Sequence, residues 1–161
     1  VRIHVKPATQ KAFTIHLRKP SWDVSSLPVE GATVSGYDPS KADYEVINRL
    51  WGPEDEALEF NFDMTVRLRR AHPKVKGHDG KVAITRGPLV YCLESVDNSE
   101  IDIFNVQLDP STLHDEFAPD LLGGCIVIYG KTTDGKPLKF IPYFLWANRG
   151  ESQMTVWVNS R

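Results

Sequence analysis

The sequence has no long apolar run and no excess of positive charge. No stretch holds 18 consecutive apolar residues, so we expect no membrane span. Lysine and arginine number 19 against 21 aspartates and glutamates, a net charge of −2, which disfavours binding to nucleic acid or to an anionic membrane surface. Because 41% of the residues are hydrophobic, we expect a globular fold and not a disordered chain.

Cysteine is scarce, with two residues that lie far apart. Cys92 sits in "LVYCLE" and Cys125 in "GGCIVIYG", and neither has the Cys-x-x-Cys or Cys-His spacing of a zinc site. Both runs are apolar, so we predict two buried, unreactive thiols. The sequence leaves open a disulfide between them, and with it the cellular compartment.

Helical patterns are also missing, and the dominant hydrophobic period is two. Apolar and polar residues alternate in "VRIHV" (1–5), "AFTIHLR" (12–18) and "ALEFNFDM" (57–64), with Gly- and Pro-rich turn signals between such runs. The pattern predicts an all-β fold, an antiparallel, jelly-roll-like β-sandwich. Residues 109–124 are the one weakly helical stretch, which we interpret as an excursion between strands.

The polar segment "AHPKVKGHDGK" (71–81) predicts a domain boundary. It divides the chain into a first β-sandwich domain, residues 1–75, and a C-terminal one, residues 76–161. Each is small for a sandwich, so we expect the two to pack together. Val1 already lies within an alternating pattern, and we therefore expect the first domain to lack strands at its N-terminal side.

Residues with catalytic chemistry are present but not in productive patterns. Acids such as Glu94 and Asp97 lie at strand ends or in loops, where solvated acids are normal, and no spacing fixes an acid pair across a cleft. The basic run between Arg67 and Lys76 could contact phosphates, but its alternation favours the solvent face of a strand. We predict no catalytic, cofactor or metal site.

"TRGPLVY" interrupts the most apolar segment. Gly87 and Pro88 predict a bend at a sheet edge, and Arg86 at that corner is placed to bind carbonyls or a carboxylate from another domain. Trp146 and Trp157 fall in the last two predicted strands. Tryptophan at such positions serves as a buried wedge or as a platform for sugar rings, and the sequence leaves both readings open.

Four stretches together resemble glycoside hydrolase family 127, the β-L-arabinofuranosidase family. They occur in the family's order over nearly the whole chain: "LRKPSW" (17–22), "YEVINRLW" (44–51), "RGPLVYCLE" (86–94) and "IPYFLWANRG…MTVWV" (141–158). The turn "WGPEDEA" departs from the family's Trp-x-x-Gly-Asp pattern, which affects loops and leaves the substrate class open.

The resemblance implies a multidomain enzyme in which an (α/α)6 barrel carries catalysis and β-sandwich domains follow it. The implied reaction is retaining hydrolysis of β-L-arabinofuranosides by a cysteine nucleophile beside a zinc ion. Those residues would lie in the barrel, upstream of this chain, so the roles are not transferred to Cys92, Cys125 or Glu94. We expect zinc in that barrel and no cofactor here.

The leading hypothesis is therefore a non-catalytic accessory region that supports the barrel of the same polypeptide and contributes to dimerisation. The alternatives are a carbohydrate-binding module that uses exposed tryptophan and tyrosine, and an enzyme in its own right. We predict no nucleic-acid or membrane partner. The residues expected in interdomain packing are Arg86, Tyr91, Trp146, Asn148 and Arg149.

Overall fold

The computed structural model describes residues 1–18, 20, 22, 44–54 and 56–160. The turn signals at Gly31, Gly36 and Pro39 lie outside these ranges. The chain divides into two units, unit 1 (residues 1–63) and unit 2 (residues 64–161). Within the described residues, no helix has the length and apolarity needed to cross a bilayer.

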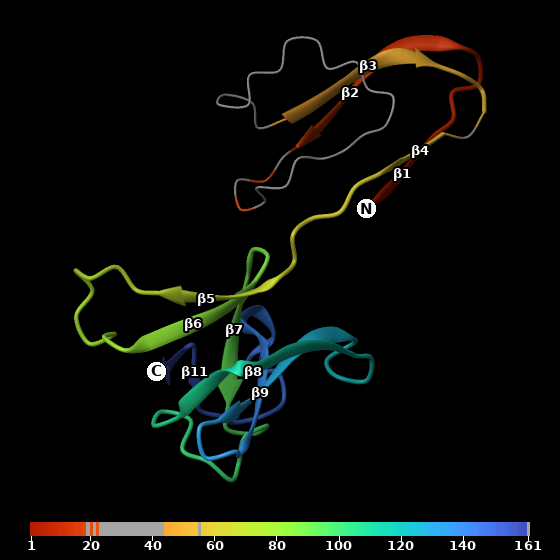
Figure 1. Cartoon of the computed structure of the whole chain (residues 1–161). Helices are drawn as coiled ribbons and strands as arrows, with labels where there is room; N and C mark the ends of the chain where they lie inside the picture. The colour runs from red at the N-terminus through yellow and green to blue at the C-terminus, as the bar shows by residue number, and fades with distance from the viewer. Residues whose placement is uncertain (19, 21, 23–43, 55, 161) are drawn as a thin grey trace. The chain divides into compact units, whose positions relative to one another are not determined.

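Unit 1 contains two antiparallel strand pairs (Figure 1). The longer pair joins β2 to β3 without a register shift, from Lys11 opposite Trp51 to Arg18 opposite Tyr44. The alternation predicted for residues 12–18 is present, because Leu17 is buried while His16 and Arg18 are exposed. The strands are β1 (Arg2–Val5), β2 (Lys11–Arg18), β3 (Tyr44–Trp51) and β4 (Glu56–Glu59).

Trp51 is the centre of the core of unit 1. Its side chain is fully buried, its ring stacks on Phe13 at 5.5 Å, and its indole N–H donates a hydrogen bond to the Phe13 carbonyl at 2.9 Å. The Arg49 guanidinium lies 4.1 Å from the ring centroid, a cation–π contact. Trp51 is therefore a core residue. The other buried members are Val5, Leu17, Ile47, Leu58 and Phe60.

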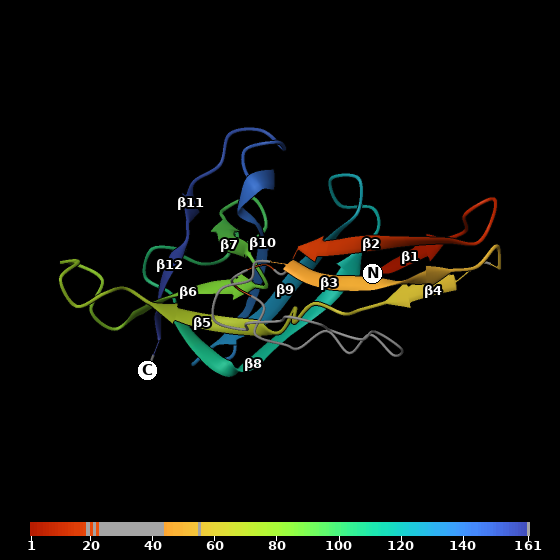
Figure 2. The ribbon, with the colours of Figure 1, turned by 90° about the horizontal axis from the view of Figure 1, so that it is seen from above.

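Unit 2 is one eight-stranded sheet that closes on itself (Figure 2). The strands β6, β7, β10, β9, β8 and β12 pair in a ring, because β6 bonds to both β7 and β12. β5 and β11 extend the sheet beyond the ring. The strands are β5 (Val66–Arg70), β6 (Lys81–Arg86), β7 (Leu89–Glu94), β8 (Gln107–Ala118), β9 (Cys125–Thr132), β10 (Pro137–Pro142), β11 (Met154–Thr155) and β12 (Trp157–Ser160), with a 3-10 turn η1 (Tyr143–Leu145).

The ring distinguishes unit 2 from the predicted open sandwich. The all-β class is confirmed, but in unit 2 the sheet is a closed six-stranded barrel. Closure depends on the last strand, since β12 pairs antiparallel with β6 and parallel with β8. A sequence pattern of alternating residues is the same for a sandwich and a barrel, so it does not distinguish them.

Two segments differ from their predicted role. Residues 109–124, interpreted as an excursion, supply most of β8, the longest strand; a register irregularity between Asp109 and His114 absorbs Pro110, which has no N–H to donate. Residues 71–81, where a domain boundary was predicted, join β5 to its direct partner β6, so the unit boundary lies earlier in the chain.

The barrel interior is filled by apolar side chains from all around the ring. Tyr91 is fully buried among them, and its hydroxyl donates a hydrogen bond to the Ile126 carbonyl of β9 at 3.1 Å. Burial raises the pKa of Tyr91, and the nearby Arg86 charge partly opposes that shift. The other buried members of this core are Val82, Ile84, Leu93, Ile103, Val106, Leu108, Ile128, Leu138, Phe140 and Val158.

The core role of Trp51 gives a first prediction. Trp51→Ala should lower the free energy of unfolding of unit 1 by about 3–5 kcal/mol, the usual cost of truncating a buried large aromatic. The neighbouring Leu50 is 57% exposed, and Leu50→Ala should change it by less than about 0.5 kcal/mol. Urea unfolding of the two variants measures both values, and equal effects would contradict the assignment.

Candidate interaction site

An exposed aromatic loop follows β10. We define the aromatic loop as residues 143–150, which begin with η1 and lead towards β11. Tyr143 is 43% exposed, Phe144 64% and Trp146 38%. Three large aromatic side chains in solvent on one short loop are unusual for a soluble domain surface, and such patches mark interaction sites.

The loop is held from below by a buried carboxylate. Glu94, the last residue of β7, is 1% exposed, and it accepts hydrogen bonds from Arg149 Nη2 at 2.5 Å and from the Ala147 N–H at 2.8 Å. A carboxylate without water must have partners, because burying an unpaired charge costs several kcal/mol. Both partners come from the aromatic loop, so the two bonds to Glu94 fix the position of the loop.

A second acid extends this charge cluster. Asp97 binds Arg149 through both carboxylate oxygens, with Oδ1 at 2.8 Å from Nη1, and it accepts a hydrogen bond from Lys139 Nζ at 2.9 Å. Burial alone would raise the pKa of Asp97, but the hydrogen bonds from Arg149 and Lys139 outweigh it and hold that pKa below the ordinary value. The hydrogen bond to Asp97, together with the bond to Glu94, outweighs burial and raises the pKa of Arg149, which stays charged.

Asn98 completes the cluster through the main chain. Its amide N–H groups donate to the Glu94 carbonyl at 2.8 Å and the Lys139 carbonyl at 3.0 Å, and its side-chain oxygen accepts from the Lys139 N–H at 2.9 Å. This buried amide therefore links the main chain of β7 at Glu94 to the main chain of β10 at Lys139. We call Glu94, Asp97, Asn98, Lys139 and Arg149 the charge cluster.

The backbone of the loop is held in an unusual conformation. Ala147 has φ +62°, in the left-handed region that non-glycine residues seldom adopt. Its N–H is the group that donates to Glu94, and the Asn148 side chain donates to the Leu145 and Trp146 carbonyls at 3.0 and 3.3 Å. A conformation of this kind persists where surrounding contacts over-determine it.

Three of the five residues predicted for interdomain packing meet in this loop. Trp146 is exposed, Asn148 closes the loop on itself, and Arg149 binds the two acids. The other two lie elsewhere in unit 2: Arg86 Nε donates to Asp115 of β8 at 2.7 Å, and Tyr91 is in the barrel core. The predicted clamp at the Gly87 bend thus binds a carboxylate of the same unit.

Sequence reasoning missed the partners of Arg149. The interpretation of Glu94 as a solvated acid is wrong, since the side chain is buried. The available signal was its position, because Glu94 ends an apolar strand whose residues 91–93 are all buried. Nothing local in the sequence indicates that Arg149, 55 positions later, supplies the counter-charge.

The cysteines are poor nucleophiles. Both are free and buried, as predicted, and Cys92 is fully buried in β7. Burial, reinforced by the neighbouring Glu94 charge, raises the pKa of the Cys92 thiol to about 12, and burial also raises the pKa of Cys125. A thiol in this state is protonated at neutral pH and does not attack substrates.

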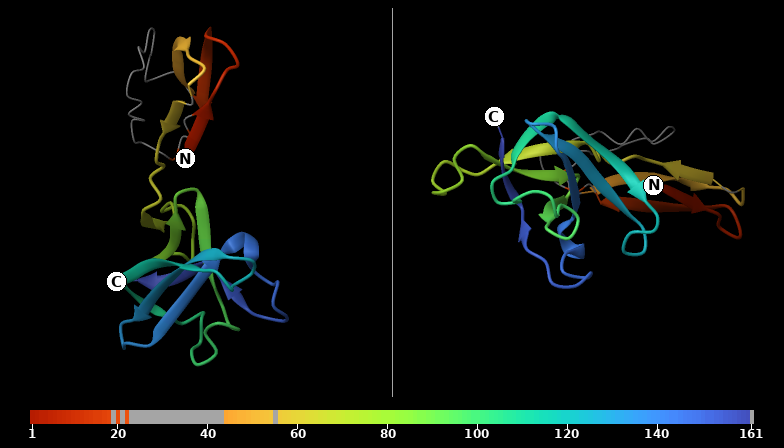
Figure 3. Two further views of the ribbon diagram at one scale, coloured as in Figure 1. Left: turned by 90° about the vertical axis from the view of Figure 1, so that its right-hand side faces the viewer. Right: turned by 90° about the horizontal axis from the view of Figure 1, so that it is seen from below.

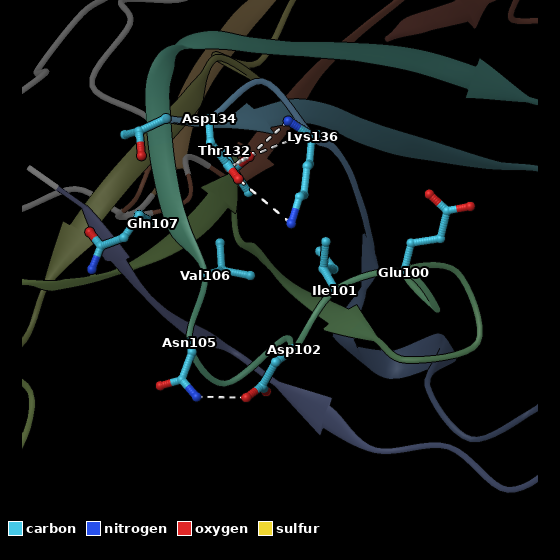
Figure 4. A pocket seen from close by; sticks show the side chains of 10 residues that line it. Glu100, Ile101, Asp102, Asn105, Val106, Gln107, Thr132, Asp134 and Lys136 are labelled. Atoms are coloured by element: carbon cyan, nitrogen blue, oxygen red, sulfur yellow. Dashed lines mark hydrogen bonds and ion pairs between the residues drawn. The ribbon is translucent and has the colours of Figure 1, made fainter.

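A polar hollow lies at the other end of β9 and β10. It encloses about 350 Å³ between residues 100–107 and the hairpin at Asp134 (Figure 4). Its polar groups mostly bind each other: Asn105 donates to Asp102 at 2.6 Å, and Thr132 donates to Asp134. Asp134 and Gly135 form the turn between β9 and β10, with Gly135 at φ +87°.

An apolar groove lies beside the aromatic loop on unit 2. It has a volume of about 480 Å³ and runs from Tyr143 of the loop along β11 to Trp157, with exposed Val90 on the β7 side. The groove and the aromatic loop thus form one continuous apolar surface at the β11 margin of the sheet.

Comparison with known proteins assigns the family. Residues 1–64 match the GH127 middle domain of β-L-arabinofuranosidase, and residues 66–159 match the glycoside hydrolase family 127 C-terminal domain. The chain belongs to glycoside hydrolase family 127. The division between the two matches coincides with the boundary between unit 1 and unit 2.

Relatives of the chain are much longer than it is. A non-reducing end β-L-arabinofuranosidase of Bifidobacterium longum subsp. longum is 33% identical over 93% of this chain and 26% of its own length. The crystal structure of a GH127 β-L-arabinofuranosidase from Geobacillus stearothermophilus T6 is 35% identical, with TM-score 0.81, over 99% of this chain and 28% of that one. A solved GH127 β-arabinofuranosidase is 30% identical, with TM-score 0.71, over 99% and 30%.

The zinc ion that the family resemblance implies does not fit the residues of this chain. Among the described residues, no three His, Cys, Asp or Glu side chains gather in a way that could hold a metal ion. Cys92 is protonated and buried, and Glu94 is committed to Arg149. We therefore derive no chemical step through zinc on this part of the polypeptide.

Removing the counter-charge of Glu94 should destabilise unit 2. Arg149→Met leaves a buried carboxylate unpaired and should lower the free energy of unfolding by about 3 kcal/mol, the lower end for breaking a buried pair because Arg149 is partly exposed. Lys136→Met removes a solvent-exposed pair with Asp134 and should have a much smaller effect, because exposed pairs contribute little to stability. Urea denaturation measures both; equal costs would contradict a structural role for the cluster.

Acid should weaken the same cluster. Because the folded-state pKa of Asp97 lies below the ordinary 3.8, its contribution to stability is complete above about pH 4 and is lost as the pH falls through the folded pKa. The stability difference between wild type and Asp97→Asn should therefore be largest at neutral pH and shrink below pH 3.8. Unfolding free energies measured from pH 7 to pH 2.5 test this, and a constant difference would refute it.

Proposed function

We propose that this chain is the non-catalytic β-region of a β-L-arabinofuranosidase-like glycoside hydrolase, and that it supports a catalytic (α/α)6 barrel of the same polypeptide. The aromatic loop carries the proposal. Tyr143, Phe144 and Trp146 are 38–64% exposed, and the charge cluster holds the loop in one conformation. A docking surface that is already ordered loses little conformational entropy on binding.

The state of the residues with catalytic chemistry supports a non-catalytic role. Arg149 and Asp97 neutralise each other, Glu94 is inaccessible to a substrate, and Cys92 is protonated. On this proposal hydrolysis of the glycosidic bond, and the zinc ion, belong to the barrel. Dimerisation through the apolar groove beside the loop is a second role that the same surface could serve.

Unit 1 fits an accessory role of the same kind. A two-stranded sheet alone is marginally stable in water, and unit 1 shows two such pairs among its described residues. We infer that it belongs to a jelly-roll-like β-sandwich. The buried Trp51 would then be part of a core larger than the one described here.

The supporting role is tested with the aromatic loop in the full-length parent enzyme. Phe144→Ser with Trp146→Ser should lower the melting temperature of the parent by several degrees, since about 1–2 kcal/mol of docking is lost, and should leave this chain alone almost unchanged. The matched control is Phe104→Ser, which alters a 50% exposed phenylalanine elsewhere on unit 2. An unaltered parent would overturn the assignment of the loop as the docking surface.

A carbohydrate-binding module is the competing function, favoured by the exposure of Tyr143 and Trp146. Titration calorimetry of this chain with arabino-oligosaccharides separates the two functions. Binding at about millimolar Kd or tighter that disappears in Trp146→Ala would establish the module. A flat titration, together with the stability result above, would establish the supporting role.

A further inference from the structure

The hairpin formed by β5 and β6 concentrates positive charge. We define the basic hairpin as residues 66–81. It holds six of the 19 lysines and arginines of the chain and one of its 21 aspartates and glutamates. The connection between the two strands projects away from the barrel in Figures 1 and 2 and in the right-hand view of Figure 3.

Four of these cations are exposed and have no acidic partner among the described residues. Arg69, Arg70, Lys74 and Lys76 lie in solvent, and within the described part of the chain none of the four takes part in an ion pair. Like charges placed together without counter-charges repel each other and create a local positive potential. The chain as a whole is acidic, so this potential is a property of one surface and not of the composition.

The hairpin displays these charges from a fixed backbone. The Val75 N–H donates to the His72 carbonyl at 2.8 Å, and the Lys81 N–H donates to the His78 carbonyl at 3.1 Å, forming two successive turns. Gly80 accepts a hydrogen bond from the N–H of Ser160 in the last strand at 2.9 Å. The base of the hairpin is thereby fastened to the barrel.

An aromatic side chain lies on the same face as Arg69. Arg69 is directly opposite Ala83 in the β5–β6 pair, and Ala83 is directly opposite Trp157 in the β6–β12 pair. Directly opposite residues point to the same face of a sheet. The Arg69 guanidinium and the Trp157 indole therefore lie on either side of the small residue Ala83. His78 packs edge-on against the Trp157 ring at 4.9 Å, which fixes the indole.

This combination matches an acidic sugar polymer. Arginine binds carboxylates through two parallel hydrogen bonds, while an indole offers a flat apolar face to a sugar ring. Outside the hairpin acids outnumber lysines and arginines by 20 to 13, which would repel a long and densely charged nucleic acid. A polysaccharide with one carboxylate per sugar has a lower charge density.

We propose that the basic hairpin, with Arg69 and Trp157 at its base, is an anchoring site for a carboxylate-bearing polysaccharide. The site would hold the glycosidase on an acidic glycan that carries or surrounds its substrate. The inference relies on membership of a glycoside hydrolase family, and it stands whether or not the aromatic loop supports a catalytic barrel.

Binding of the full chain to polygalacturonate tests the proposal. In affinity electrophoresis or biolayer interferometry at low salt, the variant Arg69→Gln/Arg70→Gln/Lys74→Gln/Lys76→Gln should bind about tenfold to a hundredfold more weakly than wild type, from four exposed charge contacts. The matched control, Lys6→Gln/Lys11→Gln/Arg18→Gln/Lys131→Gln, removes the same net charge from other exposed positions. It should bind within about threefold of wild type.

Three outcomes would overturn the proposal: no binding of the wild type to polygalacturonate, equal weakening in both quadruple variants, or equally tight binding of poly-aspartate or DNA. The last outcome would assign the hairpin to polyanions in general or to an acidic protein. Melting temperatures of both variants show whether either is unfolded. Because the aromatic loop is intact in both, their behaviour is independent of the supporting role.

Discussion

The arrangement of unit 2 around its aromatic loop depends on one constraint, the charge of Glu94 beneath it. A carboxylate at 1% exposure is tolerated only with full hydrogen bonding, and its partners are Arg149 and the Ala147 N–H. The loop between β10 and β11 therefore has to return over the end of β7. A loop without this requirement could collapse its aromatic side chains onto the barrel wall.

This arrangement lowers the stability of unit 2, and that cost has a physical explanation if the loop binds a partner. Ala147 is held in a left-handed conformation, and Tyr143, Phe144 and Trp146 remain in water, both of which oppose stability. A well-packed apolar substitute for the charge cluster would often be at least as stable. What the cluster provides is a single loop conformation, and that is valuable where a surface has to match a partner.

Sequence patterns predicted the strands better than their assembly. Alternation identified β1 and β2, and the alternating run at residues 57–64 overlaps β4, because this pattern depends on neighbouring residues. The closure of the barrel was missed, since it results from β12 joining β6 to β8 across long separations. Trp146, Asn148 and Arg149 lie on one loop because they are close in sequence, whereas the pairing of Arg149 with Glu94 was not predictable from local signals.

Closure of the barrel also determines where unit 2 can meet other molecules. The barrel interior is filled by its own side chains, and strands within the ring have no free edge to offer. The two strands outside the ring, β5 and β11, retain one edge each. β5 carries exposed arginines, which discourage pairing with another strand, and β11 has only two residues, which are too few for such pairing.

Both candidate surfaces lie at these margins, the basic hairpin at β5 and the aromatic loop at β11. The edges thus act through side chains, one through charge and the other through apolar area, and Trp157 belongs to both the hairpin site and the apolar groove beside the loop.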